Sequence, residues 1–76
     1  MSDSIFEIKK HFGVIKETRH GWTKELNLVS WYEAEPKFDI RDWDGHHERM
    51  SRGITLCEDE ARRLYEILKE IFENEN

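Results

Sequence analysis

The chain contains only one cysteine, Cys57, and only one proline, Pro36, among its 76 residues. A single cysteine excludes an internal disulfide, which favours a reducing compartment, and we predict a cytoplasmic protein. Long apolar runs are also missing, so no segment is long enough to span a membrane. The first residues, Met-Ser-Asp-Ser, do not have the basic and apolar regions of a secretory signal. We therefore expect no membrane partner.

Positive charge is scarce as well. The chain has 12 Lys and Arg against 17 Asp and Glu, a net charge of −5, whereas nucleic-acid-binding domains usually have a surplus of cations. The acidic surplus lies mainly after residue 56, where seven acids accompany three bases. Residues 1–56 hold ten acids and nine bases. This first part is nearly neutral, so the local grouping of its cations decides whether it can bind an anion.

The chain does have patterned hydrophobic residues. A chain of 76 residues forms one domain, 1–76, whose core alone is only marginally stabilising. Alternating apolar residues predict strands at about 5–17, 22–32, 37–43 and 52–56. Apolar residues at three- and four-residue steps predict a helix at about 58–73. The predicted fold class is α+β: a four-stranded antiparallel sheet followed by one C-terminal helix that covers one face and leaves the other uncovered.

Two local features carry specific expectations. Lys10 interrupts the apolar side of the first strand, so either it lies at an open rim or a bulge near His11 to Gly13 shifts the facing. At the helix start, Thr55 or Cys57 must serve as the cap. Cys57 would be a poor cap, so we expect this helix start to be weaker than it could be.

The third predicted strand carries the residues with binding chemistry. Phe38 and Ile40 alternate with Lys37, Arg41 and Trp43, so one face is buried and the other shows two cations and an indole ring. Guanidinium and ammonium groups hold phosphate, and an aromatic face accepts any base. This pattern is consistent with a nucleic-acid interface. A surface strand with no ligand is the alternative interpretation of the same spacing.

A longer motif extends this interpretation. Phe38-Asp39-Ile40-Arg41-Asp42-Trp43, then a loop, then Arg52-Gly53-Ile54-Thr55-Leu56 and an acidic helix start resembles the signature of the positive cofactor four family of single-stranded DNA-binding transcriptional coactivators. The chain is most similar to the short bacterial YdbC-type branch of this family, which the stretch 21–31 also resembles. The resemblance implies a homodimer with one curved four-stranded antiparallel sheet and one helix per subunit. It also implies that single-stranded DNA lies over the sheet face away from the helices.

The resemblance extends to individual positions. Arg41 matches the family's strand arginine that faces nucleic acid, Arg52 matches the basic residue before the Gly-Ile-Thr-Leu run, and Trp31 falls near the family's stacking aromatic. Ser51 replaces a basic residue, and the family's serine-rich regulatory region is absent, so the resemblance implies strand binding but not coactivator activity. The full predicted interface contains stacking tryptophans and phosphate-binding cations: Trp22, Trp31, Trp43, Lys10, Lys24, Lys37, Arg41 and Arg52.

The sequence therefore predicts a protein that binds single-stranded DNA with little sequence specificity, in transcription regulation or DNA maintenance, with RNA as a second ligand left open. We expect no catalytic residues, cofactor or metal. The alternative is a small dimeric protein-interaction module that uses the same sheet face, since Trp and Arg are also favoured there. A third interpretation, a metal or enzyme site, is disfavoured because adjacent histidines tend to point apart. Its residues would be Asp42, Asp44, His46, His47 and Glu48.

Overall fold

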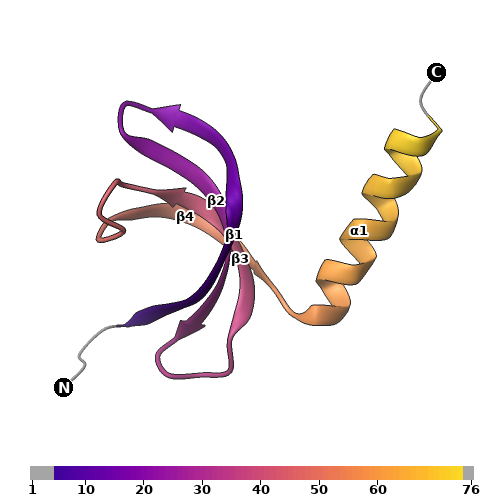
Figure 1. Ribbon diagram of the computed structural model, residues 1–76. Helices are drawn as coiled ribbons and strands as arrows, with labels where there is room; N and C mark the ends of the chain where they lie inside the picture. Colours follow the sequence, from indigo (N-terminus) through magenta and orange to yellow (C-terminus); the bar gives the residue numbers. More distant parts are fainter. Residues whose placement is uncertain (1–4, 75–76) are drawn as a thin grey trace.

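The computed structural model describes residues 5–74 of the chain. Four antiparallel strands follow one another in the order of the sequence and a helix comes last: β1 (Phe6–Arg19), β2 (Trp22–Trp31), β3 (Lys37–Trp43), β4 (Met50–Leu56) and α1 (Glu58–Glu73). The sheet is curved, and α1 stands on its convex side (Figure 1). The predicted fold class is confirmed. β1 continues to Arg19 and β4 begins at Met50, so both strands are longer than predicted.

β1 is irregular along most of its length. Its register against β2 shifts at four places, one of them between His11 and Gly13, where the sequence predicted a bulge. Each extra residue in a bulge bends its strand and increases the local twist. Lys10 pairs with Leu28, whereas His11 pairs with Asn27. The bulges therefore decide which β1 side chains face each side of the sheet.

The pairing assigns residues to the two faces, because directly opposed residues of antiparallel strands point to the same side. The concave face carries Phe6, Ile8, His11, Val14, Thr23, Glu25, Asn27, Val29, Trp31, Lys37, Asp39, Arg41 and Trp43. The convex face carries Glu7, Lys10, Lys16, Arg19, Trp22, Lys24, Leu26, Leu28, Ser30, Phe38, Ile40 and Asp42. Both faces therefore carry apolar and charged residues.

The most buried side chains of the described residues lie on the concave face. They include Val29 and Trp43 and the polar residues Asn27 and Asp39. Curvature brings inward-facing side chains together, so the sheet packs largely against itself. Gly53 allows β4 to approach closely here, because a Cβ atom at this position would collide with the Arg41 side chain and the Ile40 carbonyl oxygen.

Helix α1 does not cover the sheet, so this part of the fold prediction is wrong. No residue of Glu58–Glu73 is buried, and Phe72 is 63% exposed. Only the helix start lies beside the sheet, where Ala61 and Tyr65 come near Phe38. A single extended residue, Cys57, connects β4 to α1, so the helix begins at once and runs away from the convex face (Figure 1). No helix in residues 5–74 has the length and apolar character needed to cross a membrane.

Candidate nucleic-acid interface

Three of the predicted residues meet at one end of the concave face. Trp31 at the end of β2 and Lys37 and Arg41 on β3 line one pocket of about 340 Å³, together with Ala34, Glu35 and Thr55. We call this the Trp31 pocket. Its volume lies in the range of small-molecule sites in proteins. It brings together a half-buried indole and two cations, which are three of the residues that the sequence analysis assigned to a nucleic-acid interface.

The β2–β3 connection fixes the position of Trp31. Tyr32 and Glu33 both adopt left-handed backbone conformations, with φ of 54° and 64°, which residues other than glycine rarely do. The Ala34 N–H donates to the Trp31 carbonyl oxygen at 2.9 Å, and the Ser30 hydroxyl donates to the Ala34 carbonyl oxygen at 2.6 Å. These bonds hold a tight turn immediately beside the indole.

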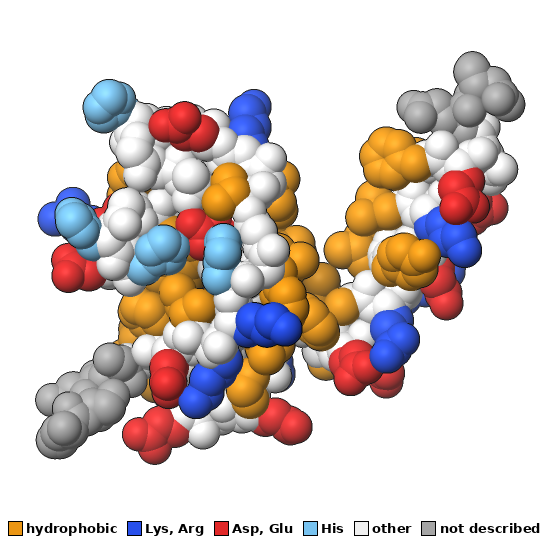
Figure 2. Space-filling model, in the orientation of Figure 1, with side chains coloured by type: hydrophobic (Ala, Val, Ile, Leu, Met, Phe, Trp, Pro, Cys, Tyr) orange, Lys and Arg blue, Asp and Glu red, His pale blue; other side chains and the backbone are white. Residues whose placement is uncertain are grey.

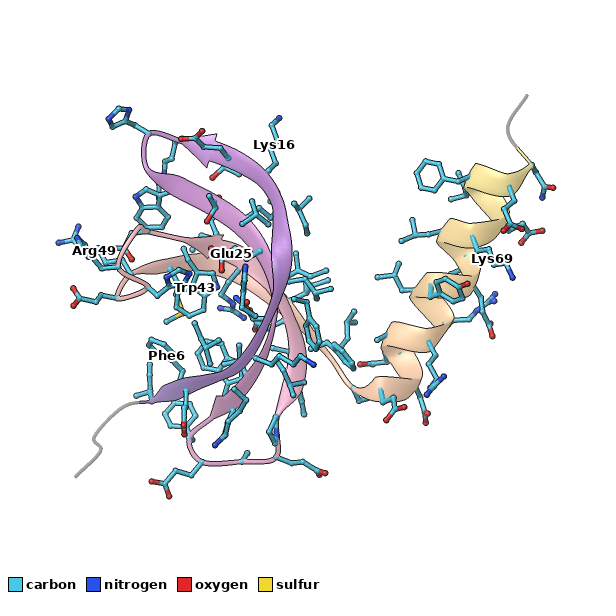
Figure 3. The ribbon with its side chains drawn as sticks, in the orientation of Figure 1. Phe6, Lys16, Glu25, Trp43, Arg49 and Lys69 are labelled. Atoms are coloured by element: carbon cyan, nitrogen blue, oxygen red, sulfur yellow. The ribbon has the colours of Figure 1, made fainter. Side chains whose placement is uncertain are left out.

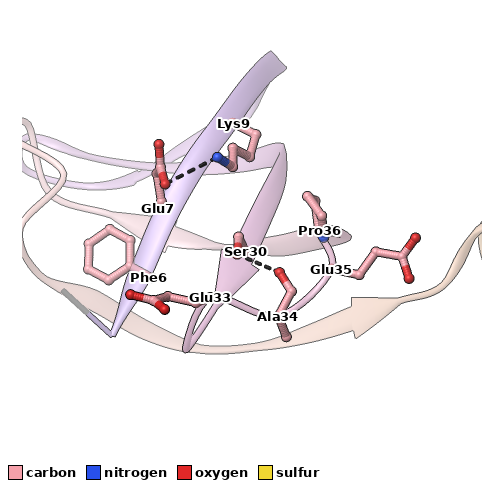
Figure 4. A pocket seen from close by; sticks show the side chains of 8 residues that line it. All are labelled: Phe6, Glu7, Lys9, Ser30, Glu33, Ala34, Glu35 and Pro36. Atoms are coloured by element: carbon pink, nitrogen blue, oxygen red, sulfur yellow. Dashed lines mark hydrogen bonds and ion pairs between the residues drawn. The ribbon is translucent and has the colours of Figure 1, made fainter. Parts of the chain in front are cut away.

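A second pocket lies beside the same turn (Figure 4). It measures about 510 Å³ and contains three carboxylates, Glu7, Glu33 and Glu35. Its one cation, Lys9, is paired with Glu7 at 3.2 Å. The electrostatic potential of this pocket is therefore unfavourable for phosphate. The Trp31 pocket is the better candidate for a nucleic-acid contact.

The positive charge of Arg41 is neutralised by the carboxylate of Asp39. Its Nε and Nη2 donate to the two carboxylate oxygens of Asp39 at 2.6 and 2.8 Å. Its guanidinium carbon also lies 4.6 Å from the centroid of the Trp31 ring. A paired guanidinium over an indole face gives a cation–π contact that holds the ring in place. Arg41 therefore positions the stacking surface of Trp31 and carries little free charge for a phosphate.

The expected exposure of Trp43 is wrong. Its side chain is 0% exposed, with the Phe6 ring at 5.1 Å and the His47 ring at 5.7 Å between centroids. Trp43 does lie on the predicted face, but the curvature of the sheet closes this face over it (Figure 3). A base cannot stack on a ring enclosed in this way. Trp43 anchors the concave core instead.

The remaining predicted residues lie away from the Trp31 pocket. Lys10, Lys24 and Trp22 are on the convex face, where Trp22 pairs with Arg19 at the far end of β2. Arg52 is exposed on β4, inside an irregular stretch of its pairing with β3. The predicted single interface is thus divided between the two faces, because bulges and strand register set the facing of each residue.

Sequence analysis missed a buried hydrogen-bond network on the concave face. Glu25 is 3% exposed and accepts hydrogen bonds from Thr23 Oγ1 at 2.6 Å and Asn27 Nδ2 at 3.1 Å. His47 Nε2 lies 3.0 Å from both carboxylate oxygens, and His11 Nδ1 lies 2.7 Å from Asn27 Oδ1. The signal in the sequence was polar residues at alternate positions 23, 25 and 27, on the strand face opposite Leu26 and Leu28.

The charge of Glu25 follows from this network. Burial raises the pKa of its carboxyl group, but the hydrogen bonds from Thr23, Asn27 and His47 outweigh burial and lower the pKa below its ordinary value of 4.5. The carboxylate therefore remains ionised near neutral pH. It ties β2 to the β3–β4 loop through His47, and Figure 3 shows it inside the curve of the sheet.

The β3–β4 loop is organised by Asp44. Its Oδ1 accepts the backbone N–H groups of Glu48 at 2.8 Å and Arg49 at 3.0 Å. Those bonds, the one from Arg49 above all, lower the pKa of Asp44. Within residues 5–74, no three His, Cys, Asp or Glu side chains are grouped so that they could hold a metal ion. Asp44 therefore supports the conformation of this loop, and His47 bonds the loop to Glu25.

Comparison with known proteins adds a relative. No family model matches the chain. A protein of Treponema pallidum (strain Nichols), described as an uncharacterized protein, is 32% identical over 66 residues, which cover 87% of this chain and 78% of the relative. The chain belongs to the same family as that protein. The relative's description names no ligand or reaction. What the present chain binds is therefore inferred from its own residues.

Proposed function

We propose that this protein binds single-stranded DNA with little sequence specificity, with a base stacked in the Trp31 pocket. The observation that carries the proposal is that the half-buried Trp31 indole shares one pocket with Arg41, which lies over its ring, and with Lys37. Base stacking on an aromatic ring tolerates any sequence, because every base has a π-face. The resemblance to the positive cofactor four family supports the same function.

The charges of the Trp31 pocket decide whether it contributes base stacking or phosphate neutralisation. Arg41 is neutralised by Asp39, and Lys37 forms no ion pair with a carboxylate of the described residues, although Glu35 lines the same pocket. The pocket therefore supplies one cation, Lys37, that forms no ion pair within residues 5–74 but lies near the carboxylates of Glu35 and Glu60. It contributes base stacking mainly, and phosphate neutralisation has to come largely from other parts of the surface.

We also propose that the protein is a homodimer built through α1. The helix exposes a stripe of large apolar side chains, and the convex face exposes Phe12 and Ile54. The stripe contains Ile67, Leu68, Ile71 and Phe72. Figure 2 shows these apolar surfaces facing each other across open space. A second copy would cover the α1 stripe and the patch of Phe12 and Ile54 in a two-fold arrangement, and would leave the concave faces and the outer end of the β1–β2 hairpin open for DNA.

The cellular location is a separate part of the proposal. We propose a cytoplasmic protein, because the lone Cys57 is an exposed free thiol, as is usual in reducing compartments. Binding of unpaired DNA would serve transcription regulation or DNA maintenance. No catalytic residue or cofactor enters the proposed mechanism, since stacking and charge neutralisation suffice for binding.

Anisotropy titration of the protein into labelled oligo-dT tests the proposal, with oligo-U and a DNA duplex of the same length as comparisons. We expect tighter binding to the single strands than to the duplex, and log K should fall linearly with log salt. The ratio of oligo-dT to oligo-U affinity gives the preference for DNA or RNA. If neither single strand binds, the proposal is wrong and the protein-interaction module becomes the better explanation of Trp31 and Arg41.

A further inference from the structure

Four cations gather on the convex face of the β1–β2 hairpin. Lys16 and Lys24 are directly paired across the two strands, Arg19 pairs with Trp22 beside the turn, and Lys10 lies further along β1 on the same face. We call Lys10, Lys16, Arg19 and Lys24 the convex cation stripe. Figure 3 shows Lys16 projecting from the outer side of the hairpin, away from the interior where Glu25 lies.

The Lys16–Lys24 pair is unfavourable by itself. Directly opposed residues of an antiparallel pair have Cβ atoms about 4.5 to 5.5 Å apart, and like charges at that position destabilise the sheet. Within the described part of the chain, none of the four stripe cations forms an ion pair with a carboxylate. Asp42, paired with Lys24 across β2 and β3, is the adjoining acid on this face. The stripe is thus a local positive surface on a chain of net charge −5.

Arg19 shows how this surface is arranged for an anion. Its guanidinium carbon lies 4.0 Å from the centroid of the Trp22 ring. A guanidinium stacked on an aromatic face keeps its N–H edge free for the oxygens of a phosphate group. The turn that joins Arg19 to Trp22 is short and contains Gly21 at a φ of 78°. The end of the hairpin therefore holds a cation in a defined orientation.

The concave face has a stacking surface but little free positive charge, whereas the convex face has free positive charge. The Trp31 pocket offers an indole but its arginine is neutralised by Asp39, whereas the stripe offers four cations without carboxylate partners among residues 5–74. We propose that the convex cation stripe binds the sugar–phosphate backbone of the same single-stranded nucleic acid and supplies most of the phosphate contacts. This inference rests on the proposed function. It assigns phosphate-binding roles to Lys16 and Arg19, which sequence analysis did not single out.

The test is the salt dependence of oligo-dT binding to the double variant Lys16→Gln/Lys24→Gln. The slope of log K against log salt is about −0.7 per neutralised phosphate for single strands, so loss of two contacts should make the slope shallower by roughly 1.4. The matched control is Arg63→Gln/Lys69→Gln, which removes two exposed cations from α1 and should leave the slope unchanged. Trp31→Ala should lower the affinity without altering the slope.

A second probe separates this inference from the proposed function. Tripolyphosphate, followed by amide chemical shifts, should perturb the β1–β2 hairpin of the wild-type protein and not that of Lys16→Gln/Lys24→Gln. Tripolyphosphate binding without oligo-dT binding would refute the proposed function and support the stripe as a phosphate-chain site. An unchanged salt slope in the double variant, or no binding of either probe by the wild type, overturns the inference. The double variant should unfold at the wild-type temperature or above, because a like-charge pair is removed.

Discussion

Arg41 donates two parallel hydrogen bonds, of 2.6 and 2.8 Å, to the carboxylate of Asp39. The Asp39 side chain is 0% exposed and that of Arg41 is 12% exposed. Arg41→Ala would leave a buried carboxylate without its partner, so we expect the free energy of unfolding to fall by about 3 kcal/mol. Urea denaturation monitored by tryptophan fluorescence measures this loss. The double variant Asp39→Asn/Arg41→Gln leaves no unpaired buried charge and should lose less; an equal or larger loss would contradict the assigned role of the pair.

Alternation in β3 predicted correctly that Lys37, Arg41 and Trp43 share a face. A period of two is a property of every strand and can be read from one sequence. The curvature of the sheet depends on pairing between strands, and it encloses Trp43 and brings Asp39 against Arg41. Alternation therefore predicts which residues share a face, but not which of them remain exposed.

The placement of Lys10 and Lys24 on the convex face shows a second limit. The four register shifts of β1 are set by pairing with β2, and only the shift near Gly13 left a signal in the sequence. The apolar period of residues 58–73 likewise predicted α1 with its observed bounds. It could not show whether the stripe packs on its own sheet or remains exposed, because amphipathicity is the same in both cases.

Trp31→Ala tests the stacking role. Loss of the indole should weaken oligo-dT binding by about 1 to 3 kcal/mol, which is roughly 5- to 150-fold in Kd. The control is Tyr32→Ala, which removes the neighbouring ring, 73% exposed and outside the Trp31 pocket. Anisotropy titration at one fixed salt concentration compares the two variants. Equal affinities for Trp31→Ala and the wild type would show that stacking takes place elsewhere.

Glu25 makes stability depend on pH in the acidic range. Its folded-state pKa lies below the ordinary value of 4.5, so the ionised carboxylate stabilises the fold. This contribution is fully present above 4.5 and disappears as the pH falls through the lower folded-state pKa. We expect the free energy of unfolding to decline in that window for the wild type. Glu25→Gln should decline less, with a remainder from Asp44 and Glu60, whose pKa values are also lowered. Parallel curves for the two proteins would contradict the role of Glu25.

Cys57 stands at the N-cap of α1. Its backbone N–H donates to Glu60 Oε1 at 2.9 Å, and its thiol sulfur faces the Glu60 backbone N–H, so that the two residues form a capping box with a weak sulfur acceptor. A serine hydroxyl is a better acceptor than a thiol for the N–H groups of the first turn, so Cys57→Ser should stabilise the helix by up to about 1 kcal/mol. Calorimetry should show a Tm higher by a few degrees at equal protein concentration. Cys57→Ala has no acceptor and serves as the control; a serine variant no more stable than the alanine variant would refute the capping argument.

Ile71 tests whether the exposed stripe of α1 is a subunit interface. Few large apolar side chains of residues 5–74 are buried, and Ile71 is one of several that remain exposed on the helix. If a second copy covers this stripe, Ile71→Glu places an unpaired charge in an apolar interface and should dissociate the dimer. Sedimentation equilibrium should give a dimer for the wild type and a monomer for Ile71→Glu.

Lys69→Glu introduces the same side chain on the polar side of the helix and should remain dimeric, which separates loss of the interface from a change in net charge. The wild-type Tm should also rise with protein concentration, because association stabilises only the folded chains, whereas the Tm of Ile71→Glu should not. A wild-type protein that sediments as a monomer would refute the proposed dimer. In that case α1 would have to fold back on the convex face of its own sheet, since an apolar stripe of this size is unfavourable in water.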